Sequence, residues 1–173
     1  MLRKIVLFFI ISICFVLQTT TFQAISLADI SPNLLIIVVS AFGFMRGKRE
    51  GMFVGFFCGL LIDIFCGYYV GIYALLYMYI GYLNGLVQKH FYPEDIKLPM
   101  LMIAMSDLVA NVFTYFVMFL FRGRFDFGYY FRAIIIPELV YTMVITIFLY
   151  FMLLKINQKI EAYEKRRAIK FDL

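Results

Sequence analysis

The stretch Gly43–Gly71, GFMRGKREGMFVGFFCGLLIDIFCGYYVG, decides the fold. Small residues recur in it at every fourth position, with one carboxylate in the series: Gly43, Gly47, Gly51, Gly55, Gly59, Asp63, Gly67 and Gly71. Glycine at this spacing within apolar sequence is typical of helices that pack closely in lipid, because small residues let two backbones approach. The basic cluster around Arg46 interrupts the apolar run, so we expect two short helices joined by a tight polar turn. On the second helix the glycines and Asp63 share one band, so we expect Asp63 to face protein.

The composition is that of an integral membrane protein. Of the 173 residues, 64% are hydrophobic and 16% are charged, whereas an average soluble domain has about a quarter charged residues. The charged residues cluster between long apolar runs, which favours a single polytopic membrane domain over residues 1–173. The net charge of +5 fits membrane orientation and gives no folded basic face, so we expect membrane lipid and no nucleic acid as a partner.

Cysteine and histidine are too sparse for a metal or redox site. The cysteines Cys14, Cys58 and Cys66 lie in apolar runs without a C-x-x-C pair, and the chain has one histidine, His90. Buried small hydrophobic residues are the ordinary role of such cysteines. We therefore expect no metal and no cofactor. The sequence also lacks a Ser/His/Asp set, a zinc-binding motif and a phosphate-binding glycine loop, so we expect no enzyme activity.

Charge-free windows predict an all-α bundle of six membrane-spanning helices. A span needs about 20 apolar residues, and the second and third windows are short. A re-entrant hairpin there would bury three basic residues at about 2.5–3.5 kcal/mol each, which favours two short spans. The first window is expected to be an uncleaved span; the alternative is a signal peptide cleaved after Ser26-Leu27-Ala28. The expected spans are residues 5–25, 32–46, 51–66, 68–88, 98–121 and 132–155.

The distribution of lysine and arginine predicts the orientation. With both termini in the cytoplasm, all but three of the 16 Lys and Arg residues lie inside, as the positive-inside rule requires. The exceptions, Arg122, Arg124 and Arg132, lie in an aromatic loop over residues 122–132. That loop either anchors at the outer headgroup boundary or docks an external partner domain. The basic tail, residues 156–173, continues the last helix and contacts anionic lipid or a cytoplasmic protein.

Three carboxyl residues fall within the expected spans: Asp63, Asp107 and Glu138. Such residues are costly in lipid and usually face the bundle interior. Asp107 shares a helix face with Asn111, and Glu138 shares one with Thr142. All three carboxyls are expected from mid-membrane outward, so they could share one outward pocket that holds a proton or recruits an arginine. The alternative is that they only hold helices together. With Arg46, the candidate partner-binding or pocket residues are Asp63, Asp107, Asn111, Glu138 and Arg46.

The sequence resembles a known family. The string begins with Ser31-Pro32-Asn33-Leu34-Leu35-Ile36 and continues as Gly43…Arg46-Gly47…Gly51…Gly55-Phe56…Gly59-Leu60-Leu61-Ile62-Asp63, then Gly71…Ala74-Leu75. It is similar to the MreD family of bacterial rod shape-determining proteins, and the family string matches at Pro32, Arg46, Gly55, Gly59 and Asp63. The resemblance covers essentially the whole chain.

The resemblance implies a non-enzymatic member of the cell-elongation complex in the bacterial cytoplasmic (inner) membrane. Its implied partner is the bitopic protein MreC, and through it MreB and the elongation-specific peptidoglycan synthases. The implied fold is related to the six-helix S-components of energy-coupling-factor transporters. In this hypothesis the glycine-lined helices form a rigid scaffold, and an outer groove takes the transmembrane helix or juxtamembrane segment of MreC.

Two other functions are open. One is an S-component-like substrate-binding subunit of a vitamin or metal-ion transporter. S-components dock through an Ala-x-x-x-Ala motif in the first helix, whereas the first helix here has only Ala24. The other is a small ion or lipid transporter. It would predict inverted repeats, and residues 1–88 show no convincing similarity to residues 89–173.

Overall fold

The structure is a computed structural model that describes residues 2–21, 31–65, 71–90, 96–122 and 127–169. Every regular element in these ranges is helical, which confirms the predicted all-α class. Six helices have 13 or more residues, and short 3-10, π and α turns extend some of them. The elements are α1 (Leu2–Val16) with a π turn (Leu17–Thr21), α3 (Leu34–Arg46), α4 (Lys48–Phe65), α5 (Ile72–Leu86) with a 3-10 turn (Val87–His90), α6 (Lys97–Arg122), α7 (Phe127–Tyr130) with a π turn (Phe131–Ile135), and α8 (Ile136–Ile169).

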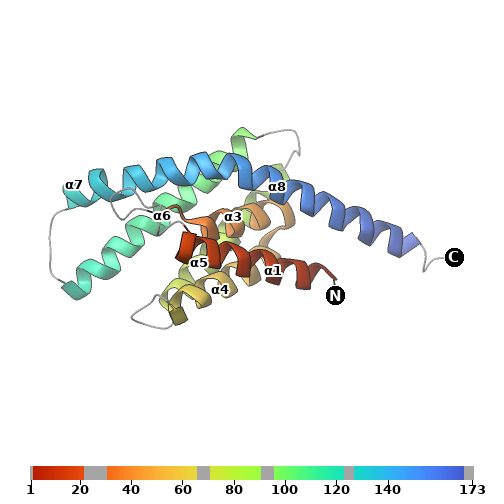
Figure 1. Cartoon of the computed structure of the whole chain (residues 1–173), viewed down its shortest axis with the longest axis horizontal. Coiled ribbons are helices and arrows are strands. Elements are labelled where there is room, and N and C mark those ends of the chain that lie inside the picture. The colour runs from red at the N-terminus through yellow and green to blue at the C-terminus, as the bar shows by residue number, and fades with distance from the viewer. Residues whose placement is uncertain (1, 22–30, 66–70, 91–95, 123–126, 170–173) are drawn as a thin grey trace.

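Helix α3 is the centre of the bundle. Its residues from Leu34 to Met45 are all buried, and it contacts α1, α4, α5, α6 and α8 (Figure 1). Its sequence is apolar on every side, as a helix needs to be when neighbours surround it completely. With 13 residues it is about 20 Å long.

The predicted tight turn between two short helices is present. Helix α3 ends at Arg46, and Gly47 takes φ +92, a left-handed value that favours glycine. The Gly47 N–H donates to the Gly43 carbonyl at 2.8 Å, and the Gly51 N–H donates to the Gly47 carbonyl at 2.9 Å. Helix α4 begins at Lys48 rather than at the expected residue 51, because its charged first turn is helical although it is too polar to count as part of a span.

Helices α4 and α5 pack backbone against backbone. A Cβ atom at Gly51 would overlap the carbonyl of Gly81, and one at Gly81 would overlap the carbonyl of Gly51. Further along α4, a Cβ atom at Gly55 would overlap the Tyr77 carbonyl, and one at Gly59 would overlap the Tyr73 carbonyl. The close contact between α4 and α5 therefore requires glycine at these positions of α4.

Three helical runs are long and apolar enough to cross a membrane: Arg3–Thr20, Lys97–Val117 and Gly128–Glu164. Helix α3 is apolar but shorter, and α4 and α5 have 18 and 15 residues. The expected start of the fourth span at residue 68 lies outside the described residues, as does the cleavage site of the signal-peptide alternative.

The helical run that contains α8 begins earlier than the expected sixth span, and its continuation into the basic tail agrees with the prediction. Part of the expected outer loop, residues 127–132, is helical and leads directly into α8, and α8 continues to Ile169. The start of this run is held by ring contacts, among them Tyr130 with Tyr115 of α6 at 5.0 Å between centroids. Helix α1 begins and α8 ends on the same side of the molecule (Figure 1), which we call the terminal end; the start of α8 marks the distal end.

Candidate functional site

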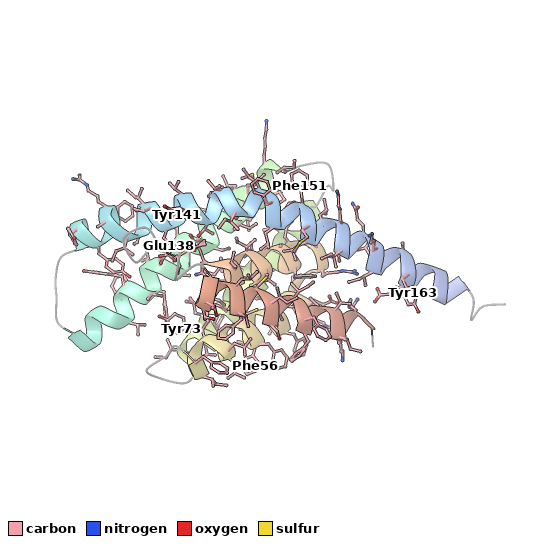
Figure 2. All side chains as sticks on the ribbon, in the orientation of Figure 1. Phe56, Tyr73, Glu138, Tyr141, Phe151 and Tyr163 are labelled. Carbon is pink, nitrogen blue, oxygen red and sulfur yellow. The ribbon has the colours of Figure 1, made fainter. Side chains whose placement is uncertain are left out.

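Asp107 of α6 and Glu138 of α8 form a buried acidic pair toward the distal end. Asp107 lies on the interior face of α6 with Ile103, Ala110 and Asn111, and its exposed fraction is 0%. Glu138 lies in the first turn of α8 and is partly exposed. It lies close enough to Asp107 for the two carboxyl groups to interact electrostatically. Figure 2 shows Glu138 on the side of α8 that faces α6. The structure therefore brings together two of the three predicted carboxyl groups.

Each carboxyl group of the pair has a neutral polar neighbour. The Thr142 hydroxyl lies against Asp107, and the Asn111 amide lies against Glu138. Nevertheless, neither Asp107 oxygen makes a hydrogen bond of acceptable geometry with any group in the described part of the chain. The same holds for the Asn111 side-chain nitrogen. Thr142 is fully buried, and its hydroxyl accepts the backbone N–H of Asn33 at 3.2 Å. Polar side chains therefore lie next to the acidic pair, but they leave the Asp107 oxygens without a hydrogen bond of good geometry.

Further hydrogen bonds connect this site to the π turn after α1, to the start of α3 and to α5. The Tyr77 hydroxyl donates to Asn33 Oδ1 at 3.1 Å, and the Gln18 amide nitrogen approaches the same oxygen at 3.5 Å. The Gln18 side-chain oxygen Oε1 in turn accepts the Leu35 backbone N–H at 3.1 Å. Sequence reasoning did not assign Gln18, Asn33 and Tyr77 to the site, although each is a polar residue within or beside a long apolar run.

Asp63 has a separate role, as a cap on another helix. Its carboxylate accepts the backbone N–H groups of Gly71, Tyr73 and Ala74 at 2.9, 3.0 and 2.9 Å. The first N–H groups of a helix have no partner within the helix, and no side chain at the start of α5 supplies one. Asp63 of α4 fills that need. Its oxygens are engaged there, so it does not join the acidic pair as the shared-pocket hypothesis expected.

Arg46 lies at the terminal end, away from the acidic pair. Its Nε donates to Asn157 Oδ1 at 2.6 Å, and its guanidinium pairs with Glu161 at 3.5 Å and Glu164 at 3.9 Å. The positive charge also lies at the carboxyl end of α3, where the helix dipole favours it. The structure thus places Arg46 in a cluster that holds the terminal part of α8.

Arg3 joins the same cluster from α1. It pairs with Glu50 of α4 and with Glu164 of α8, the latter at 3.6 Å. All ion pairs found among the described residues belong to this cluster. The acidic pair at the distal end is therefore not ion-paired within the described part of the chain.

A third group of polar side chains joins α5 to its neighbours, separate from the acidic pair and from the Arg46 cluster. The Asn84 amide of α5 donates to Ser106 of α6 at 2.7 Å and approaches Ser40 of α3 at 3.4 Å. All three side chains are buried. These hydrogen bonds join α5 to α3 and α6.

The groups of the acidic pair can bind a positive charge. Among the described residues, no group of three or more His, Cys, Asp or Glu side chains could hold a metal ion by itself. Two carboxylates with neutral oxygen and amide neighbours can attract a positive charge, share a proton or order a helix interface.

The family comparison gives one result. The family model described as rod shape-determining protein MreD matches residues 1–160. Searches of curated proteins and of solved structures returned no match.

Proposed function

The chain belongs to the MreD family of rod shape-determining proteins, and we propose that it is a non-enzymatic membrane scaffold of the bacterial cell-elongation complex. In this role it binds MreC and helps control cell shape and lateral peptidoglycan synthesis. MreB and the elongation-specific peptidoglycan synthases are indirect partners. The observation that carries the proposal is the family match, which covers residues 1–160 of the chain.

We place the chain in the bacterial cytoplasmic membrane with six spans and both termini inside. The distribution of lysine and arginine supports this orientation. The start of α1 and the end of α8 lie on one side of the molecule, which supports it as well. The terminal end is then cytoplasmic, and the acidic pair lies in the outer half of the membrane. The short helices α3, α4 and α5 cross as a unit with the longer α6 and α8.

The packing of the molecule suits a scaffold. Helix α3 is buried on all sides, and α4 and α5 are in backbone contact. Polar contacts between helices fix the arrangement at both ends and in the middle. A body held in this way presents its outer surfaces in a fixed relation, which favours binding of a single partner helix because few groups need to be ordered.

We place the MreC contact on the outward-facing sides of α6 and α8, toward the distal end of the molecule. Exposed apolar side chains lie there on both helices, among them Phe113 and Phe116 of α6 and Ile136 and Val140 of α8. A single transmembrane helix could lie along such a surface through van der Waals contact, as helices associate in lipid.

Site-specific photo-crosslinking in cells that express MreC tests this placement. A photoreactive residue at Phe116 or Val140 is expected to crosslink to MreC. The matched control is Phe53 of α4, which is similarly exposed, at 67% against 57% and 55%. Crosslinking at Phe53 alone would reject the proposed surface but leave the scaffold role intact. Failure of MreC to co-purify with the wild-type chain would contradict the partner assignment itself.

One observation favours the alternative function of an S-component-like substrate-binding subunit. Asp107 is fully buried, and its carboxylate meets hydrogen-bond geometry with no described group, which is a common feature of sites that bind a ligand. Co-purification of the chain with transporter ATPases, in place of MreC, would support this alternative.

A further inference from the structure

We propose that Asp107 and Glu138 form a binding site for one hard divalent cation, with Ca²⁺ as the best match. The Thr142 hydroxyl supplies a neutral oxygen ligand, and water from the distal side completes the coordination. The proposed protein ligands all come from α6 and α8 of this chain, so the site needs no ligand from MreC.

The first argument is charge balance. The carboxyl groups of Asp107 and Glu138 lie close enough to interact electrostatically, and that of Asp107 is completely buried. The ion pairs of the described residues all lie at the terminal end, so none neutralises the acidic pair. Arg132, the basic residue closest in sequence to Glu138 whose side chain is described, is exposed and pairs with neither carboxylate. Unpaired charges in a low-dielectric interior are strongly unfavourable, and one divalent cation cancels both.

The second argument is the unused coordination capacity of Asp107. Both of its carboxylate oxygens are buried, yet they satisfy hydrogen-bond geometry with no described partner. Most buried polar groups in folded proteins have partners, so each exception calls for an explanation, such as an ion that binds there. A carboxylate that can use both oxygens is a usual ligand of Ca²⁺.

The third argument is that the neighbouring groups are held in place. The Thr142 hydroxyl beside Asp107 accepts the Asn33 N–H at 3.2 Å, and Asn33 is itself bonded by Tyr77 at 3.1 Å. The Asn111 amide lies next to Glu138. A fixed oxygen set reduces the ordering that an ion requires.

The donor types and the burial select the ion. All the proposed ligands are oxygens, which suit hard cations such as Ca²⁺ and Mg²⁺. Mg²⁺ gives up its water reluctantly, whereas Ca²⁺ accepts protein oxygens in flexible geometry. Because Asp107 is fully buried and Glu138 only partly exposed, an ion that reaches both must lose much of its hydration. This favours Ca²⁺.

Two measurements on the purified full-length chain in nanodiscs of neutral lipid test the site. The first is thermal unfolding with CaCl₂, MgCl₂, NaCl or KCl, at ionic strength held constant with choline chloride. The second is equilibrium binding of radioactive Ca²⁺. We expect CaCl₂ to raise Tm saturably, by at least about 2 °C, and binding to reach one ion per chain.

The variants Asp107→Asn and Glu138→Gln keep the shape of each side chain and remove its charge. Both are expected to abolish the Tm response and the Ca²⁺ binding. Glu164→Gln is the matched control at the terminal end and is expected to respond as the wild type does. Thr142→Val is expected to bind Ca²⁺ more weakly than the wild type in the equilibrium binding measurement. This variant keeps both carboxyl groups, so it still tests the site if the carboxyl variants fold poorly.

Several results would overturn the proposal. One is the absence of Ca²⁺ binding by the wild type. If Asp107→Asn is then also more stable than the wild type, the pair shares a proton. Another is an equal response of the wild type and both carboxyl variants, which would mean binding elsewhere. A response to NaCl or KCl alone would reject a divalent ion.

Discussion

Asp63 of α4 accepts the backbone N–H of Ala74 in α5 at 2.9 Å, across a connection that joins the two most closely packed helices. The same carboxylate also accepts the N–H groups of Gly71 and Tyr73. A side chain of one helix thus caps the next helix, where the residue in the cap position is a glycine. The close backbone packing of α4 on α5 makes this reach possible.

Replacing Asp63 by alanine should destabilise the fold without affecting the acidic pair. Hydrogen bonds to a charged acceptor contribute about 1.5–3 kcal/mol each, and the buried N–H of Ala74 would lose this acceptor. We expect the free energy of unfolding to fall by about 2–3 kcal/mol, measured by denaturant titration in detergent. Asp63→Asn should lose less, because the amide oxygen still accepts. An unchanged stability for Asp63→Ala would show that water replaces the carboxylate.

Glycine to alanine substitution at Gly55 should separate α4 from α5. The added methyl group would overlap the Tyr77 carbonyl, which belongs to backbone and cannot turn away. Overpacking of this kind costs about 1–3 kcal/mol. Gly128→Ala is the matched control, since nothing lies within 4 Å of the position that its methyl group would take, and we expect a change within about 0.5 kcal/mol. Comparable losses at both positions would contradict the role given to the glycine series.

Gly71→Ala isolates the backbone contribution at the start of α5. Gly71 has φ +106, and its added Cβ atom would meet nothing within 4 Å. Because no clash arises, any loss comes from forcing an L side chain into the left-handed region, which costs about 1–2 kcal/mol. Thermal unfolding of Gly71→Ala beside the wild type measures this loss. A stabilised variant would mean that the unfolded-state entropy of glycine outweighs the strain.

Arg46→Ala should release the terminal part of α8. The Arg46 side chain is 12% exposed, whereas its partners Glu161 and Glu164 are 41% and 43% exposed, so solvent screens part of the interaction. We expect a loss of about 1–2 kcal/mol and faster backbone hydrogen exchange over residues 157–164. The exposed Lys159 of the same helix provides the control substitution Lys159→Ala, which should leave exchange unchanged. Equal exchange rates in the two variants would argue against the cluster as the anchor.

The helix content, the glycine spacing and the turn between α3 and α4 could be predicted because they depend on local sequence. Apolar windows define helices, and a basic cluster with Gly47 ends one helix and begins the next. Periodicity also predicted that Asp63 faces protein, because residues four positions apart share a face, and the cost of a carboxyl group in lipid predicted the same for Asp107. The start of α4 at Lys48 and the helix over residues 127–132 were missed, because hydropathy reports the apolar span and not the full helix.

The sequence by itself determined which faces are small, apolar or polar, because that information repeats along one helix. The tertiary structure decided which faces meet. Arg46 finds its partner Asn157 at a sequence separation of 111, Asn33 finds Thr142 at a separation of 109, and Asp63 caps α5 while Asp107 faces Glu138. A helical period fixes the direction of a side chain but not the neighbour that it meets. That neighbour depends on how all the helices pack at once around α3.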